Sequence, residues 1–130
     1  MEQLDMHQMM IVDDSEFMRR FLSKFLGKKL SLTLVADGVE ALQKLHGGYR
    51  PNVILADINM PNLNGFEFLE HLQASPLYRS IPVIMLSSND DSNDRIKSLR
   101  LGAVDYILKP FNPIELELRI EAQIQRISSK

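Results

Sequence analysis

The chain has 130 residues, of which 45% are hydrophobic and 25% charged, a composition typical of a single soluble globular domain. It contains no cysteine, which excludes disulfides, thiolate metal sites and a cysteine nucleophile. The formal net charge of −2 and the scattered Lys and Arg residues argue against direct nucleic-acid binding, and no apolar run approaches the ~20 residues that a membrane span needs.

Five short apolar runs are predicted to be β-strands. Most of them are continuous rather than alternating, which is typical of strands covered on both faces, as in a parallel sheet. In chain order they are Met9–Val12, Leu32–Ala36, Val53–Ala56, Val83–Leu86 and Tyr106–Leu108.

A predicted helix follows each strand. The first four are Glu16–Leu26, Val39–Leu45, Phe66–Gln73 and Ser92–Leu101, and the fifth begins at Pro113. Alternating strands and helices of this length predict one α/β domain over residues 1–130, a doubly wound (βα)5 fold with a parallel five-stranded sheet and helices on both faces.

The last helix has an unusual apolar pattern. Asn112 is expected to cap it, with Pro113 at its first position and Glu115 placed for a capping box. At ~100° per residue its apolar residues form two stripes on roughly opposite sides. One stripe contains Ile114, Leu118 and Ala122, and the other Leu116, Ile120, Ile124 and Ile127. One must pack on the sheet, so the other is expected to be a partner surface, unless neighbouring helices partly bury both.

Polar side chains follow four of the predicted strands. Asp13 and Asp14 come after the first, Asp57 after the third, Ser87 after the fourth and Lys109 after the fifth. The carboxyl ends of parallel strands share one edge of the sheet, where ligands bind. We therefore expect three carboxylates, a hydroxyl and an ammonium group to converge there.

Three adjacent carboxylates repel one another unless cations join them. Lys109 supplies one positive charge, and a hard divalent cation would supply the rest; oxygen ligands favour Mg²⁺. His7, His46 and His71 fall outside the strand ends, which disfavours Zn²⁺ or Cu²⁺. A carboxylate in such a site can attack phosphorus to form an aspartyl-phosphate, stabilised by the metal, an ammonium group and a hydroxyl.

Four ordered segments carry a resemblance to a known family. Together they make the chain similar to the receiver domain of bacterial two-component response regulators of the chemotaxis-regulator type, over essentially its whole length. The segments are Met10–Ser15, Asp57–Pro61 with Gly65, Met85–Ser88 and Gly102–Phe111.

The resemblance implies a flavodoxin-like fold with strand order 2-1-3-4-5. It implies that Asp57 accepts a phosphoryl group from a histidine kinase or from small phosphodonors. It further implies that Mg²⁺ is held by the side chains of Asp14 and Asp57 and the backbone carbonyl of Asn59, with Asp13 assisting through water.

The same resemblance assigns roles around the phosphoryl group. Ser87 and Lys109 would contact its oxygens, and Ser87 and Tyr106 would move together and remodel the face made by helix 4, strand 5 and helix 5. Asn59 and Asn89 stand where the family tunes hydrolysis of the phosphoaspartate. Ser87 replaces the commoner Thr, and the Lys109–Pro110 bond is expected to be cis.

Two other functions remain open. A phosphatase with an Asp nucleophile usually has a second Asp two residues later as acid or base, but Asn59 stands there and cannot exchange protons. A degenerate receiver would act only as a binding module, although all the required groups are present. We expect a signalling receiver that catalyses only its own phosphorylation and dephosphorylation.

The expected partners follow from this reading. They are a sensor histidine kinase or phosphotransfer protein, and a downstream protein or fused output domain at the helix 4–strand 5–helix 5 face, which would also allow a homodimer. A chain cut from a longer regulator is slightly favoured over a stand-alone receiver. The polar first eight residues lack a signal peptide's apolar core, so we expect a cytoplasmic protein without membrane attachment.

Overall fold

All ten predicted elements are present in the structure, a computed structural model that describes residues 7–128, with side chains to residue 126. Their ends differ from the predicted ones by at most two residues. The elements are β1 (His7–Val12), α1 (Glu16–Leu26), β2 (Leu30–Val35), α2 (Gly38–His46), β3 (Val53–Asp57), α3 (Gly65–Gln73), β4 (Val83–Ser87), α4 (Ser92–Arg100), β5 (Asp105–Leu108) and α5 (Pro113–Ser128).

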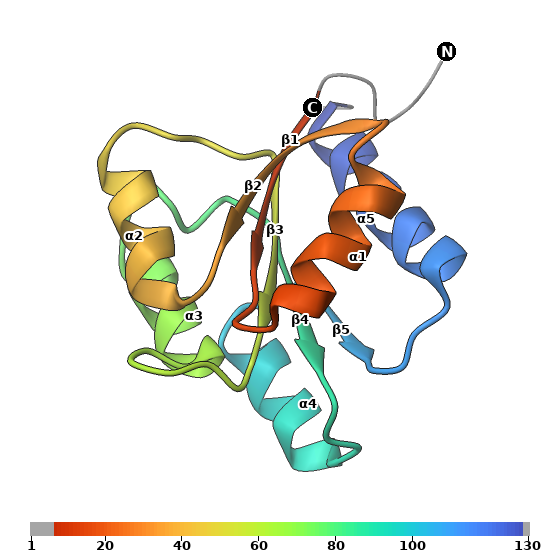
Figure 1. Ribbon diagram of the computed structural model, residues 1–130. Coiled ribbons are helices and arrows are strands. Elements are labelled where there is room, and N and C mark those ends of the chain that lie inside the picture. The colour runs from red at the N-terminus through yellow and green to blue at the C-terminus, as the bar shows by residue number, and fades with distance from the viewer. Residues whose placement is uncertain (1–6, 129–130) are drawn as a thin grey trace.

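The five strands form one parallel sheet in the order β2-β1-β3-β4-β5. This confirms the predicted flavodoxin-like, doubly wound fold. All strand arrows point toward the lower edge in Figure 1, so the carboxyl ends of the strands lie together there. None of the helices in the described part of the chain has the length and hydrophobicity needed to cross a bilayer.

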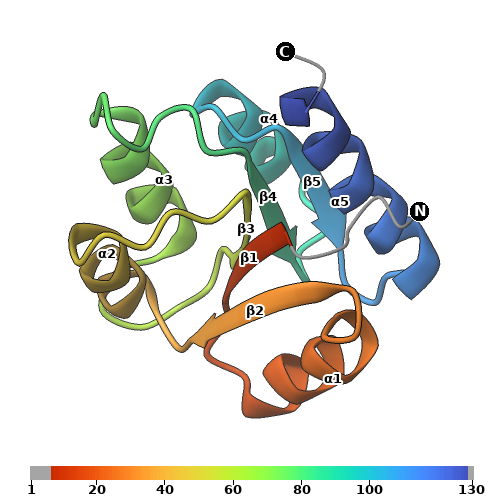
Figure 2. The ribbon, with the colours of Figure 1, turned by 90° about the horizontal axis from the view of Figure 1, so that it is seen from above.

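The sheet separates two hydrophobic cores, which explains the continuous apolar strands. In β1, Met9 and Ile11 face the core beneath α1 and α5, whereas Met10 and Val12 face the core beneath α2 and α3. The view from above shows these helix layers on opposite faces of the sheet (Figure 2). Each fully buried aliphatic side chain stabilises the fold by ~1.5–3 kcal/mol relative to exposure.

The two stripes of α5 are separated as the sequence predicts. Leu116, Ile120 and Ile124 are buried at 0%, 0% and 2% exposure and pack in the core shared with α1. Ile114 and Leu118 remain 64% and 58% exposed. Ala122 is also exposed, and the side chain of Ile127 lies outside the described residues. The stripe that contains Leu118 is therefore the outward one.

Only one of the two interactions of the predicted capping box of α5 is present; the prediction for Glu115 is wrong. The side-chain oxygen of Asn112 does accept hydrogen bonds from the backbone N–H groups of Ile114 and Glu115, at 2.9 and 3.3 Å. The Glu115 carboxylate instead accepts from Arg119, 2.8 Å away, because a guanidinium one turn along the helix is a stronger donor than a neutral amide.

Candidate functional site

The three predicted carboxylates come together at the carboxyl edge of the sheet. Asp13, Asp14 and Asp57 each offer a carboxylate oxygen, and these atoms all lie within 4.8 Å of one another. The parallel pairing of β1 with β3 is the cause, since it aligns Val12 with Ala56 just before the acidic residues. Asp13 and Asp57 are buried, at 1% and 6% exposure, whereas Asp14 is exposed to solvent.

Lys109 reaches the same cluster from the end of β5. Its ammonium nitrogen lies 3.2 Å from an Asp13 oxygen and 3.7 Å from an Asp57 oxygen. Its backbone N–H donates to the carbonyl of Ser87 at 2.7 Å, and its bond to Pro110 is cis, as expected. One ammonium group against three carboxylates leaves the cluster negative, so a divalent cation would be attracted to it.

Burial raises the pKa of Asp57 to about 6. The Lys109 ammonium lowers it, the charges of Asp13 and Asp14 raise it, and a hydrogen bond from the Asn59 backbone lowers it. Ionised Asp57 is therefore a destabilised, partly desolvated anion, which a cation bound beside it would relieve.

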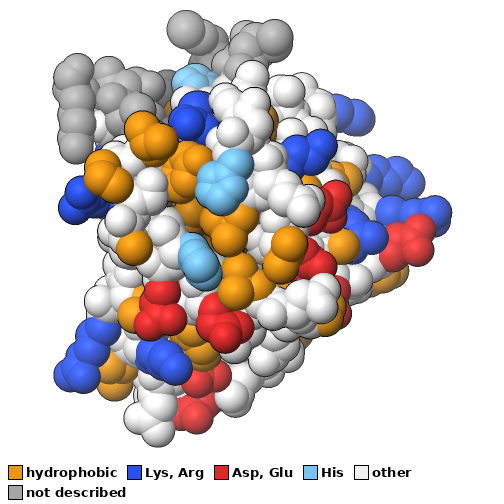
Figure 3. Space-filling view, turned by 90° about the vertical axis from the view of Figure 1, so that its left-hand side faces the viewer, with side chains coloured by type: hydrophobic (Ala, Val, Ile, Leu, Met, Phe, Trp, Pro, Cys, Tyr) orange, Lys and Arg blue, Asp and Glu red, His pale blue; other side chains and the backbone are white. Residues whose placement is uncertain are grey.

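The donors around this cluster are all oxygens, which fits a hard cation such as Mg²⁺ and not a soft metal. The three histidines lie elsewhere, since His7 begins β1, His46 ends α2 and His71 lies within α3. On the molecular face that carries α2 and α3, histidine side chains are surrounded by hydrophobic ones (Figure 3).

The turn after β1 holds Asp13 in place through contacts that the sequence did not reveal. The Ser15 N–H donates to an Asp13 side-chain oxygen at 2.9 Å, and the Arg19 guanidinium donates to the Asp13 carbonyl at 2.6 Å. The Ser15 hydroxyl caps α1 by accepting a hydrogen bond from the Met18 N–H. Nothing in the sequence distinguishes Arg19 from the neighbouring Arg20, because only the folded turn directs its side chain inward.

The loop after β3 passes close to Asp57 and needs a small residue at one point. A Cβ atom on Gly65 would lie only 2.6 Å from the Asp57 carbonyl oxygen, so any larger residue would displace the loop. Asn62 adopts a left-handed backbone conformation with φ of 69°, and its amide donates to an Asp37 oxygen at 3.0 Å. This bond ties the loop to the beginning of α2.

Asn89 links the remaining predicted residues. Its N–H donates to the Ser87 hydroxyl at 3.0 Å, and its carbonyl accepts from the Tyr106 hydroxyl at 3.1 Å. Its side-chain amide donates to Asp94 of α4 at 3.0 Å, which ties this loop to the first turn of α4. Ser87 is fully buried, and both it and Tyr106 contact the same peptide segment.

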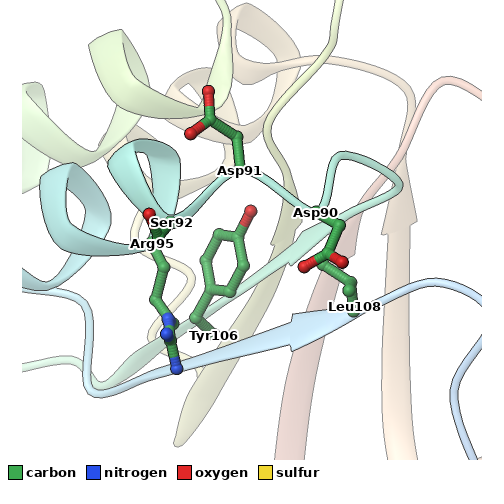
Figure 4. A pocket seen from close by; sticks show the side chains of 6 residues that line it. All are labelled: Asp90, Asp91, Ser92, Arg95, Tyr106 and Leu108. Atoms are coloured by element: carbon green, nitrogen blue, oxygen red, sulfur yellow. The ribbon is translucent and has the colours of Figure 1, made fainter.

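Tyr106 lies beside an open cavity of about 300 Å³ between β5 and the start of α4. The ring stands among side chains from both elements (Figure 4). The lining residues are Asp90, Asp91, Ser92, Arg95, Tyr106 and Leu108. A change in the position of Tyr106 would therefore alter the surface of α4 and β5.

Comparison with solved structures finds the same fold around this site. The receiver domain of the sensor histidine kinase PA1611 from Pseudomonas aeruginosa, described with a magnesium ion coordinated in its active-site cleft, is 29% identical; the match covers 92% of this chain and 98% of that one, with a TM-score of 0.84. The chemotaxis response regulator CheY4 of Vibrio cholerae is 32% identical over 91% of this chain and 98% of its own, with a TM-score of 0.83.

Sequence comparison agrees. The phosphate regulon transcriptional regulatory protein PhoB of Escherichia coli is 45% identical over 78 residues, which are 60% of this chain and 34% of that protein. The chain spans about half or less of the length of the curated relatives it matches. The family model of the response regulator receiver domain matches residues 9–121. The chain therefore belongs to the response regulator receiver domain family, the signalling modules of two-component systems.

Proposed function

We propose that the chain is a single receiver domain in which Asp57 accepts a phosphoryl group and thereby switches the domain between two states. The observation that carries this proposal is the meeting of Asp13, Asp14, Asp57 and Lys109 at one edge of the sheet. The chain would catalyse only its own phosphorylation and dephosphorylation. A phosphatase acting on other substrates is disfavoured because Asn59 offers no proton-exchanging group beside Asp57.

The proposed cofactor is Mg²⁺, held by the carboxylates of Asp14 and Asp57 and the backbone carbonyl of Asn59, with Asp13 assisting through water. The ion would supply positive charge beside the oxygens of the transferring phosphoryl group. The magnesium ion described for the 29% identical receiver domain of PA1611 supports this assignment.

The residues around Asp57 have distinct proposed tasks in phosphoryl transfer. A carboxylate oxygen of Asp57 attacks phosphorus while the bond to the donor's imidazole nitrogen breaks, and the imidazole leaves with the electron pair. Lys109 and the Ser87 hydroxyl stabilise charge on the phosphoryl oxygens. Lys109 is already positioned, since its ammonium nitrogen is 3.7 Å from an Asp57 oxygen.

The switch is proposed to run through Asn89. Movement of the Ser87 hydroxyl toward a phosphoryl oxygen would remove the acceptor of the Asn89 N–H and so disturb the bond from Tyr106 to the Asn89 carbonyl. Asn59 and Asn89 are proposed to tune hydrolysis, and Asn89 would first have to leave Asp94.

The proposed partners are a sensor histidine kinase or phosphotransfer protein as donor, and a downstream protein or attached output domain as receiver of the signal. The α4–β5–α5 face is the proposed output surface, and it would also serve in a homodimer. Its support is the exposed apolar side chains of Ile96, Leu99, Ile114 and Leu118.

Labelling with radioactive acetyl phosphate tests the proposed phosphoacceptor. We expect the wild type to be labelled with Mg²⁺ and not with EDTA, and Asp57→Asn to remain unlabelled. Asp90→Asn, which removes an exposed carboxylate, is the matched control and should label normally. Lys109→Ala should still accept label. The change in Tyr106 fluorescence that accompanies labelling of the wild type should, however, be lost in this variant. Equal labelling of Asp57→Asn would exclude Asp57 as the acceptor, and an unlabelled wild type would favour a degenerate receiver.

A further inference from the structure

Two adjacent arginines of α1 differ in where their side chains lie. The helix begins beside the carboxyl edge of the sheet, directly after the turn that follows β1 (Figure 1). Arg19 is half-buried, and its guanidinium donates to the Asp13 carbonyl at 2.6 Å. Arg20 is exposed and pairs with Glu16 at 3.0 Å. Arg19 makes no ion pair with any residue the structure describes, so its side chain is held at the turn by the Asp13 carbonyl.

The bond from Arg19 completes the set of hydrogen bonds to Asp13. One carboxylate oxygen of Asp13 accepts from the Ser15 N–H at 2.9 Å, and the other accepts from the Lys109 ammonium at 3.2 Å. The Asp13 N–H donates to the Val35 carbonyl at 3.1 Å. With the carbonyl bound by Arg19, every polar atom of this residue has a partner. A fully bonded buried group is held in one orientation.

The position of Asp14 depends on that orientation. Asp14 is exposed, and its carboxylate accepts no hydrogen bond from another residue in the described part of the chain, so the backbone alone places it. The Asp13 carbonyl belongs to the peptide that joins Asp13 to Asp14, and a planar peptide turns as one unit. A bond that holds this carbonyl therefore also fixes where the Asp14 side chain begins, beside Asp57.

We infer that Arg19 is a positioning residue, which fixes the Asp13–Asp14 peptide in the orientation that Mg²⁺ binding requires. The inference rests on the proposed function, because it takes Asp14 and Asp57 as ligands of the ion. Loss of an outer partner that orients a metal ligand typically costs ~10–100-fold in metal affinity.

The charge of Arg19 acts in the opposite direction. Removing a positive charge near three carboxylates would by itself make the site more negative and Mg²⁺ binding tighter. Removing the hydrogen bond to the Asp13 carbonyl would loosen the turn and make binding weaker. The sign of the change in affinity therefore separates positioning from simple electrostatics.

Titration of the ¹⁵N-labelled chain with MgCl₂ at constant ionic strength, followed by NMR, tests the inference. We expect Arg19→Gln to bind Mg²⁺ about tenfold more weakly than the wild type or worse. Arg20→Gln makes the same change of charge one residue later and is the matched control, which should bind as the wild type does. Arg19→Lys keeps the charge and a donor for the carbonyl, so its affinity should lie closer to that of the wild type than to that of Arg19→Gln.

Relaxation of ¹⁵N in the metal-free proteins gives a readout that does not depend on the ion. In Arg19→Gln the order parameters of the Asp13, Asp14 and Ser15 amides should fall, whereas those in the middle of α1 should not change. In Arg20→Gln the order parameters of the turn should stay at the wild-type level.

The outcomes separate this inference from the proposed function. Mg²⁺ binding by Arg19→Gln that equals or exceeds that of the wild type, equal weakening in Arg20→Gln, or a turn that stays rigid in Arg19→Gln would each overturn the inference alone. A wild type that binds no Mg²⁺ would overturn the proposed function together with the inference.

Discussion

Asp57 is a buried carboxylate whose negative charge is only partly balanced by Lys109. The sequence predicts its place after a strand, because the apolar run before it is clear. Its burial and its raised pKa could not be predicted, because they depend on how deeply the surrounding loops cover it. The same applies to Arg19, whose bond to the Asp13 carbonyl exists only in the folded turn.

We predict that Asp57→Asn stabilises the metal-free protein at pH 7 by about 3 kcal/mol, because the pKa of Asp57 is raised by roughly two units and each unit corresponds to ~1.4 kcal/mol. The pKa of Asp57 is about 6 in the folded chain against an ordinary value of 3.8. Between these values the folded state holds a proton that the unfolded state has lost. The contribution of Asp57 therefore lowers the stability of the wild type as the pH rises from 3.8 to about 6. Above pH 6 the stability remains at this lower level.

Urea denaturation in EDTA at several pH values measures this effect. The difference between Asp57→Asn and the wild type should shrink as the pH falls from 7 toward 4. Asp90→Asn, at an exposed position, should leave stability within ~0.5 kcal/mol at every pH. A difference between Asp57→Asn and the wild type that does not change with pH would show that packing, and not the ionised carboxylate, is responsible.

Among the elements, α4 is weakly anchored compared with α3. Phe68, Leu69 and Leu72 of α3 are fully buried, whereas the only buried residue of α4 is Ser98. Ile96 of α4 remains 46% exposed. An element that buries little apolar surface can shift at low cost, which suits the proposed role of α4 in the switch.

We predict that Ser98→Ala stabilises the fold by about 1 kcal/mol. The Ser98 hydroxyl is buried without a hydrogen-bond partner, and alanine both removes this group and has the higher helix propensity. Chemical denaturation gives the free energy of unfolding. Ser23→Ala, at a half-buried position of α1, is the control, because it shows the effect of the higher helix propensity of alanine alone. Destabilisation by Ser98→Ala would mean that the hydroxyl has a partner, such as an ordered water.

The strands were easier to predict than the details of the helices. Burial on both faces leaves a continuous apolar run for each strand, and this run marks its position to within two residues. Helix ends depend on competition between nearby donors and acceptors. Glu115 shows this, because Arg119 takes the carboxylate that the sequence pattern assigns to a cap.

Across the whole molecule, topology determines which residues can meet. Parallel strands place their carboxyl ends at one edge, so the approach of Asp14 and Asp57 could be predicted from residues far apart in the chain. The hydrogen bonds that join neighbouring loops could not, including those from Asn62 to Asp37 and from Asn89 to Asp94. These depend on loop conformations for which short sequence patterns carry no distinctive signal.

The same topology predicts that Mg²⁺ stabilises the whole fold, because the unfolded chain does not hold Asp14 and Asp57 together. At a concentration ~100 times its Kd, a ligand specific for the native state adds about 2.7 kcal/mol. We expect the thermal midpoint of the wild type to rise with MgCl₂ and not with NaCl of equal ionic strength. In Asp14→Asn the rise should be lost, although its metal-free midpoint should equal or exceed that of the wild type. That variant removes one repelling charge at an exposed position and leaves the core unchanged. An equal rise of the thermal midpoint in the wild type and in Asp14→Asn would show that Mg²⁺ binds at another site and that the acidic cluster does not bind the metal.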